Sequence, residues 1–232
     1  MGITRGPNIV TDGLVFAVDA ANPSSYVSGS TIWKDQTVSQ NNGTLTNGPT
    51  FDNGNGGSIV FDGSNDYVDY GTPTWLGTGP ITLSCFIKYG PGNITACSVI
   101  SDYDSNGIGS LYMQIRFDNI KYFRGNNAGA STNLSTTVDL NDDKWHNIVF
   151  TDDQSNFRIY IDGIEDNDRS SIPESSIANS TSFMIGQSGL GGSFFPGRLS
   201  NIKIYHKALS ASEVLQNYNA LKPRFGLWNL AV

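Results

Sequence analysis

The chain has 232 residues, with 14 Lys and Arg against 21 Asp and Glu, a formal net charge of −7 and a pI near 4.6. Few and scattered basic residues argue against a nucleic-acid partner, because backbone phosphates attract clustered Lys and Arg. No apolar run approaches the length of a membrane span, and the N-terminus lacks the apolar core of a signal peptide. We therefore expect neither membrane insertion nor a signal peptide.

Glycine is abundant, with 26 residues, and only 15% of the chain is charged, which is typical of many short strands joined by tight turns. A chain of this length can bury most of its surface in one two-sheet core without disulfides or metals. In chain order, apolar residues alternate with a period of two in several segments, which predicts strands. The clearest are Leu14–Val18, Ile81–Ile87, Leu111–Phe117 and Phe157–Ile161. Leu199–Tyr205 is also rich in strand residues, and Asp62–Asp66 is a turn between the two strand-like runs of Ser58–Tyr70.

One helix is expected, near the C-terminus. Helical spacing begins at Ala208 and runs to Tyr218, and Ser210 with Glu213 forms an S-x-x-E capping box. Strands that follow one another without intervening helices favour an antiparallel sandwich. The fold class expected is therefore all-β, an antiparallel two-sheet sandwich with one short C-terminal helix.

The chain has two cysteines, Cys85 and Cys97, and both share strand parity with apolar residues that face a core. Two interpretations are open. The cysteines are buried free thiols that pack as small apolar groups, or they form a disulfide between neighbouring strands.

Catalytic patterns are missing from the sequence. The three glutamates, Glu165, Glu174 and Glu213, cannot form a pair on one strand face, which a glycoside hydrolase of this architecture would need. There is no G-x-S-x-G motif, and the two histidines, His146 and His206, fit structural positions. We expect a protein that is not an enzyme.

Acidic residues offer one candidate metal site. Asp102, Asp104 and Asn106 alternate before Gly107, a spacing that can direct oxygen ligands at a hard cation such as calcium. The twelfth position, which should be Glu in an EF-hand, is Met113. The alternative is an acidic turn without metal.

Exposed aromatic rings beside polar side chains are the usual platform for a sugar. The candidates from expected loops and strand ends are Trp33, Trp75, Tyr103 and Tyr122, together with Tyr26.

The C-terminal residues are unusually apolar for a chain end: Phe225, Leu227, Trp228, Leu230 and Val232. They fold back onto their own sandwich, or they form an assembly contact with another subunit. In the second case, removing residues 223–232 should leave a folded, soluble monomer.

Several segments in order resemble laminin-G-like and pentraxin-like domains, which share the concanavalin-A-like jelly roll. They are Gly13–Asn22, Trp33 with Asp35, Ser58–Tyr70, Trp145–Val149, Phe157–Gly163 and the strand–helix ending Phe195–Leu215. The resemblance divides the chain into an N-terminal arm at 1–11, the jelly-roll domain at 12–221 and an apolar tail at 222–232. It also implies that Gln187 joins the calcium site, and that Asp19, Asp35, Asp62 and Asp66 could form a second acidic cluster.

Three further segments, Arg5–Leu14, Asn42–Phe51 and Arg224–Leu227, are similar to stand-alone domains of this type in tailed-phage virion proteins. This resemblance implies an adhesive or structural protein of the virion surface, assembled in the host cytoplasm. Its partners would be copies of itself, other virion proteins and host-cell glycans. The alternative is a bacterial calcium-dependent lectin-like carbohydrate-binding module.

Overall fold

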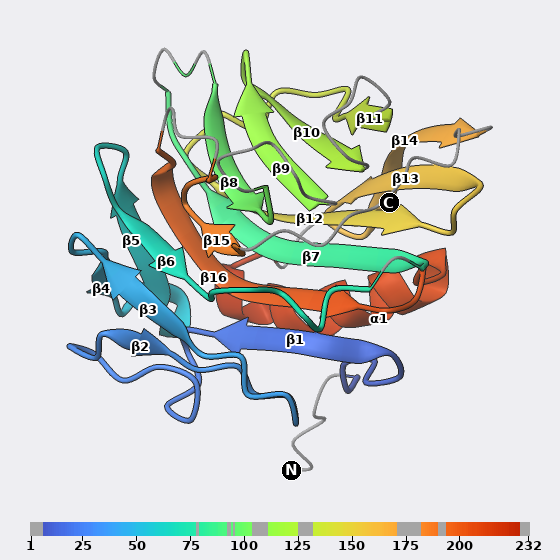
Figure 1. The fold of residues 1–232 in the computed structure, drawn as a ribbon. Coiled ribbons are helices and arrows are strands. Elements are labelled where there is room, and N and C mark those ends of the chain that lie inside the picture. The colour runs from blue at the N-terminus through green and yellow to red at the C-terminus, as the bar shows by residue number, and fades with distance from the viewer. Residues whose placement is uncertain are drawn as a thin grey trace, which may run out of the picture.

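Two antiparallel sheets packed face to face form the molecule, with one short helix on the outside (Figure 1). The computed structural model describes residues 7–77, 79–91, 94, 96–103, 111–124, 132–170, 182–189 and 194–227. This architecture confirms the predicted all-β two-sheet sandwich with a C-terminal helix.

Sheet A has the strand order β14-β13-β12-β7-β16-β5-β4, and β1 also pairs with β16. Its strands are β1 (Leu14–Asp19), β4 (Thr50–Asp52), β5 (Ser58–Asp62), β7 (Ile81–Lys88), β12 (Trp145–Asp152), β13 (Asn156–Ile161), β14 (Ile164–Ser170) and β16 (Pro196–Tyr205).

Sheet B has the order β11-β10-β9-β8-β15-β6-β3-β2. Its strands are β2 (Ile32–Trp33), β3 (Gly43–Thr46), β6 (Tyr67–Asp69), β8 (Cys97–Ser101), β9 (Leu111–Arg116), β10 (Asn119–Arg124), β11 (Thr132–Ser135) and β15 (Met184–Ile185). Two single-turn 3₁₀ helices, η1 (Gly54–Gly56) and η2 (Lys222–Phe225), complete the elements.

The core lies between the two sheets and is filled by the alternating apolar residues of both. Cys85 and Cys97 belong to it and are buried free thiols, as the first of the two interpretations predicted. Burial raises the pKa of both thiols, that of Cys97 to about 12, so neither is poised for thiolate chemistry.

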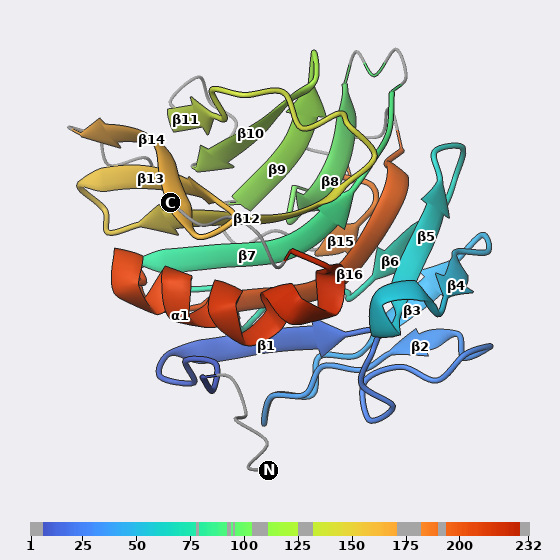
Figure 2. The same ribbon diagram turned by 180° about the vertical axis from the view of Figure 1, so that it is seen from behind.

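Helix α1 (Ala211–Leu221) covers the outer face of sheet A, and Figure 2 shows it lying along β16. Ser210 is its N-cap. The Ser210 hydroxyl accepts from the backbone N–H of Glu213, while the Glu213 carboxylate accepts from the backbone N–H of Ser210 at 2.9 Å. The capping box is therefore confirmed, and the helix begins at residue 211 rather than 208 because its N-cap has extended backbone angles. No helix in the described part of the chain is long and apolar enough to cross a membrane.

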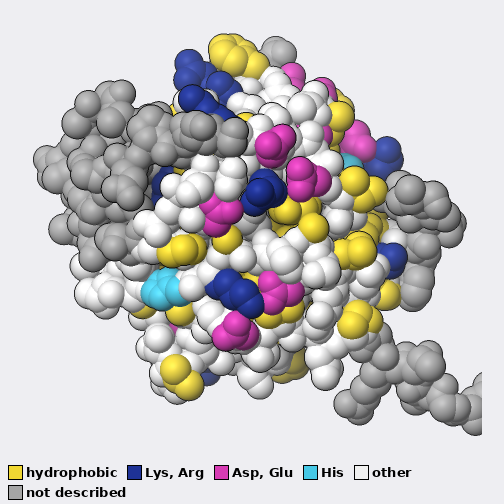
Figure 3. Space-filling view, turned by 90° about the vertical axis from the view of Figure 1, so that its right-hand side faces the viewer, with side chains coloured by type: hydrophobic (Ala, Val, Ile, Leu, Met, Phe, Trp, Pro, Cys, Tyr) yellow, Lys and Arg dark blue, Asp and Glu magenta, His cyan; other side chains and the backbone are white. Residues whose placement is uncertain are grey.

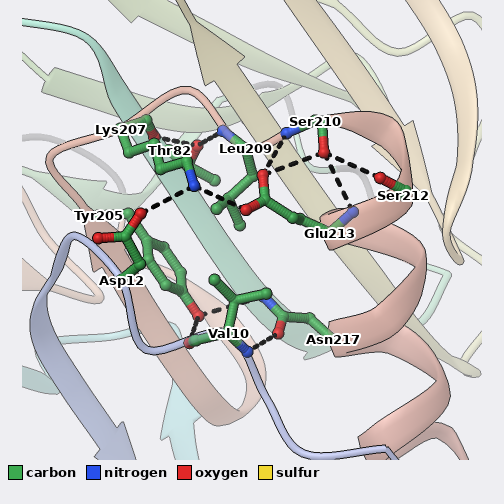
Figure 4. A network of polar contacts seen from close by, with 10 residues as sticks. All are labelled: Val10, Asp12, Thr82, Tyr205, Lys207, Leu209, Ser210, Ser212, Glu213 and Asn217. Carbon is green, nitrogen blue, oxygen red and sulfur yellow. Dashed lines mark hydrogen bonds and ion pairs between the residues drawn. The ribbon is translucent and has the colours of Figure 1, made fainter.

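The N-terminal residues are fastened to this helix by buried hydrogen bonds (Figure 4). The backbone N–H of Val10 donates to Asn217 Oδ1 at 2.8 Å, and the Tyr205 hydroxyl donates to the Val10 carbonyl at 3.2 Å. Lys207 Nζ bridges Asp12 and Glu213 at 3.0 and 2.7 Å. Residues from both ends of the chain thus pack on sheet A.

Phe225, at the end of η2, is also part of this covering layer. Its ring stacks on Phe86 of β7 at 4.0 Å between centroids and 8° between planes, and it lies 5.0 Å from the ring of Trp145. Leu227 packs against the same cluster. The prediction that Phe225 is an assembly contact is therefore wrong, because the ring is buried against its own sheet; Trp228 and Leu230 lie outside the described residues.

His146 of β12 lies between two carboxylates. Its Nδ1 is 2.9 Å from Asp162 and its Nε2 is 3.2 Å from Asp142, so both ring nitrogens can donate only when the imidazole is protonated. Burial by itself lowers the pKa of His146, but the hydrogen bonds and charges of Asp162 and Asp142 outweigh burial and raise it above 6.5.

This geometry predicts a pH-dependent part of the stability. A raised folded-state pKa means that the contribution is fully present below pH 6.5 and is lost as the pH rises through the folded pKa. We expect the urea midpoint to fall over that range, and His146→Gln to lose this component. An equal pH dependence in the variant would contradict the assignment.

Candidate functional site

The two sheets differ in what their outer faces offer to a ligand. On sheet A, α1, η2 and the N-terminal residues bury the outward side chains of β7, β12 and β16. The face drawn in Figure 3 mixes acidic, basic and hydrophobic side chains without a large area of one kind among the described atoms. The outward face of sheet B around β8, β9 and β10 is therefore the place to look for a site.

Alternation sets which side chains of β9 and β10 point outward. Leu111, Met113 and Ile115 lie in the core, so the residues between them, Tyr112 and Gln114, face away from it. On β10 the core residues are Ile120, Tyr122 and Arg124, and those that face outward are Asn119, Lys121 and Phe123.

Three aromatic rings form a continuous strip on this outward face. Tyr112 and Phe123 are directly paired across the two strands, with ring centroids 5.7 Å apart and an interplanar angle of 29°. Tyr103 follows β8 and lies 5.5 Å from Tyr112. The Tyr112 hydroxyl is 2.8 Å from the hydroxyl of Ser98, which fixes the direction of the ring. Tyr112 and Phe123 are half-buried, whereas Tyr103 is only 5% exposed.

Tyr112 and Phe123 were not predicted as site residues from the sequence, although the alternation around Met113 indicated which residues of this strand face outward. Their rings become neighbours only through the register of β9 with β10. The same alternation wrongly extended to Phe117, which lies in the hairpin turn after β9 with a φ of +49° and is 67% exposed.

Other predicted platforms are corrected by the structure. The rings of Trp33 and Tyr122 are fully buried in the core, and Tyr122 stacks on Phe150 at 4.8 Å across the sandwich. Trp75 is half-buried, and one of its ring faces is occupied by Phe16 at 5.0 Å. The rings of Trp33 and Tyr122 therefore have no free face for a sugar, and Trp75 is held by Phe16 and by an edge contact with Phe183 at 5.1 Å. Tyr26 is likewise buried.

A buried ion pair supports the strip from behind. Arg124, at the end of β10, points between the sheets, and its Nε lies 3.3 Å from Asp152 Oδ2 at the end of β12. The guanidinium also donates to the carbonyl of Gly79 at 2.9 Å. Burial raises the pKa of Asp152 even though Arg124 lies beside it.

The structure brings together two segments of the predicted calcium site. The backbone N–H of Gly189 donates to the Tyr103 carbonyl at 2.8 Å, so the Asp102 and Gln187 segments lie side by side. Asp102 is fully buried and accepts from the backbone N–H of Leu111 at 2.6 Å. Gln187 Oε1 is buried and has no hydrogen-bond partner among the described residues. Asp104 and Asn106 lie outside the described residues, so the calcium site stays a prediction.

The other acidic cluster is divided among separate structural roles. Asp35 accepts from the backbone N–H groups of Ala17, Thr37 and Asn41, and Asp19 pairs with Arg224 at 2.8 Å. The remaining two, Asp62 and Asp66, hold their own hairpin turn. Within the described ranges, no three His, Cys, Asp or Glu side chains are grouped to hold a metal ion.

The glutamates and histidines that the structure describes lie in separate parts of the molecule. Glu213 belongs to the helix cap and Glu165 to β14, while Glu174 lies outside the described residues. His206 Nε2 accepts from the backbone N–H of Gly77 at 3.0 Å, a structural contact as expected.

The sandwich agrees with what the comparisons find. A model of the concanavalin A-like lectin/glucanases superfamily matches residues 62–215, more than half of the chain. The chain belongs to this superfamily. The region of the concanavalin A-like match includes β8, β9, β10 and β15, and therefore the whole aromatic strip.

Toxin binding domains are among the solved structures similar to this concanavalin A-like chain. They include the binding domain of Paraclostridial Mosquitocidal Protein 1, with a TM-score of 0.72, 17% identity and coverage of 90% of this chain and 52% of that one. The receptor binding domain of botulinum neurotoxin C/D mosaic serotype has a TM-score of 0.72 and 12% identity, covering 89% and 51%. The botulinum neurotoxin serotype D domain in complex with N-acetylneuraminic acid has a TM-score of 0.66 and 12% identity, covering 89% and 50%.

At these identities the likeness shows the fold alone, and the chain spans about half the length of the matched structures. A search of curated protein sequences finds no match.

Proposed function

We propose that this protein is a non-enzymatic carbohydrate-binding domain that holds a sugar against Tyr112 and Phe123. The observation that carries the proposal is the directly paired, stacked and half-exposed arrangement of these two rings on the outward face of sheet B. The similar solved structures named above are binding domains, and one of them is in complex with a sugar, which supports the same class of function.

The chemistry of the surroundings suits a carbohydrate. The apolar face of a pyranose packs on an aromatic ring, while its hydroxyls need fixed polar groups nearby. The Tyr112 hydroxyl and the half-buried Lys121 can serve as such groups, whereas Gln114, paired with Lys121, and Ser98, beside Tyr112, are buried. The buried Arg124–Asp152 pair lies on the core side of β10 and links it to β12.

The biological setting that we propose follows from the sequence resemblance: an adhesive protein on the surface of a tailed-phage virion. Several copies on one particle would convert weak glycan binding into avidity for a host surface. Its partners would then be copies of itself, neighbouring virion proteins and host-cell glycans, with assembly in the host cytoplasm.

Glycan binding by single-residue variants tests the proposed site. We expect Tyr112→Ala and Phe123→Ala each to weaken binding about tenfold, a loss of about 1.4 kcal/mol, because each removes one stacking surface. Tyr112→Phe keeps the ring and should bind nearly normally. Ligands are found on a glycan array and titrated by calorimetry.

The matched control is Tyr67→Ala, which removes a half-buried aromatic ring from β6 of the same sheet, away from the strip. Unchanged binding in both strip variants would show that the site lies elsewhere.

A calcium-dependent lectin-like module is the second candidate. The buried oxygen of Gln187, which has no hydrogen-bond partner in the described ranges, lies beside the Asp102 segment and favours it. Repeating the titration with calcium and then with chelator separates the two: binding that is lost with chelator supports the calcium-dependent module, and binding that is retained supports the metal-free site.

A further inference from the structure

Two basic side chains continue the outward row from the aromatic pair. Arg116 lies at the end of β9 and is exposed, and Lys121 lies in the middle of β10 and is half-buried. Neither forms an ion pair within the part of the chain that the structure describes. Most other described basic residues are neutralised; Lys88, Arg158 and Arg198, for example, each pair with an aspartate.

The positive charge of this row is opposite in sign to the net charge of the whole protein. The chain carries a net charge of −7, yet the outward positions of β9 and β10 hold two cations and no acid. They are Tyr112, Gln114, Arg116, Asn119, Lys121 and Phe123. Cations that have no ion pair among the described residues, beside an aromatic platform, favour a ligand that supplies negative charge.

The strand register gives the row a direction and a length. Tyr112 pairs with Phe123, Gln114 with Lys121, and Arg116 with Asn119. A strand advances about 3.4 Å per residue, so Arg116 lies roughly 14 Å along β9 from Tyr112, with the level of Lys121 halfway. This spacing fits several linked sugar units rather than a single sugar.

The far end of the row is held by the turn that follows Arg116. The Tyr89 hydroxyl donates to the Asp118 carbonyl at 3.0 Å, and Asn119 Nδ2 donates to the Thr136 carbonyl at 3.1 Å. The Arg116 guanidinium lies 5.8 Å from the centre of the Phe117 ring. Phe117 itself has a φ of +49°, in the left-handed region that a bulky side chain rarely adopts. These hydrogen bonds fix the end of the β9–β10 hairpin from which the Arg116 side chain extends.

We propose that the ligand class is a linear anionic oligosaccharide, such as a chain of uronic acids or a sulfated glycan. One sugar packs on Tyr112 and Phe123, and the carboxylates or sulfates of the following units meet Lys121 and Arg116. A planar guanidinium suits either anion, because it can donate two parallel hydrogen bonds. This inference rests on the proposed carbohydrate function and names its substrate class.

The test uses an array that carries each acidic glycan beside its neutral counterpart, with uronates methyl-esterified and sulfates removed. We expect binding to the acidic members, weakening as salt is raised. Arg116→Gln and Lys121→Gln should each reduce affinity about tenfold, and the double variant more. Lys34→Gln, at an exposed site on the chain before β3, is the matched control and should bind like the unchanged protein.

Circular dichroism is used to check that the variants are folded. We expect them to be, because the substituted side chains lie on the outward face of the sheet. Equal binding of acidic and neutral members, or full affinity in the double variant, would overturn the proposal that the ligand is anionic. In that case a loss of binding in Tyr112→Ala would still support the sugar site. Absence of binding to every glycan would overturn the carbohydrate function itself, and this inference with it.

Discussion

Arg124→Met is expected to lower the free energy of unfolding by about 3–5 kcal/mol, because it leaves a buried carboxylate without its cation. Arg124 is 2% exposed and Asp152 is 3% exposed, and the two side chains join β10 of sheet B to β12 of sheet A. Burial already raises the pKa of Asp152 with the arginine present, so removing the positive charge makes the ionised form costlier still. Urea unfolding at neutral pH measures the loss.

Two variants make this result interpretable. Replacing both partners, as Arg124→Met with Asp152→Leu, removes the uncompensated charge and should recover most of the stability. Arg158→Gln breaks an ion pair with Asp153 that is about one third exposed, and should cost less than about 1 kcal/mol. If Arg124→Met lowered the free energy of unfolding no more than Arg158→Gln does, the buried pair between the two sheets would not contribute to stability as expected.

Phe225→Ala is expected to cost about 3–5 kcal/mol, the usual loss for a buried phenylalanine. The ring stacks on Phe86 and contacts Trp145, so its removal leaves a cavity over the outer face of sheet A. Arg224 strengthens the same anchor: its guanidinium contacts Asp19 at 2.8 Å and the Gly57 carbonyl at 3.2 Å. Removing residues 223–232 should therefore destabilise the domain at least as much as Phe225→Ala.

This expectation replaces the earlier one that the shortened chain remains a stable monomer. Removal of residues 228–232 alone is the control, because it keeps Arg224 and Phe225 in place. If that shorter deletion leaves the unfolding midpoint unchanged and abolishes self-association in light scattering, the assembly role belongs to Trp228 and Leu230. A Phe225→Ala variant with unchanged stability would contradict the expectation that packing of Phe225 on sheet A stabilises the domain.

Local patterns predicted much of the fold. The alternation in Leu111–Ile115 and Phe157–Ile161 and the pair Ser210 and Glu213 were sufficient, because strand faces and helix caps depend on neighbours within a few residues. The cysteines were placed correctly in the core for the same reason. The end of the strand after Arg116 was missed, because a phenylalanine with positive φ has no sequence signal.

The candidate site was harder to predict, because its members come from strands whose register the sequence does not state. Trp33 and Tyr122 looked like exposed platforms, yet packing between the sheets buries both rings. Tyr112 and Phe123 looked unremarkable, yet pairing of β9 with β10 stacks them on the outward face. The sequence by itself determined the sandwich, the helix cap and the core positions of the two cysteines, since each follows from spacing along the chain. Only the tertiary structure decided which aromatic rings face outward and where the Phe225 ring packs, because burial depends on contacts between residues far apart in sequence.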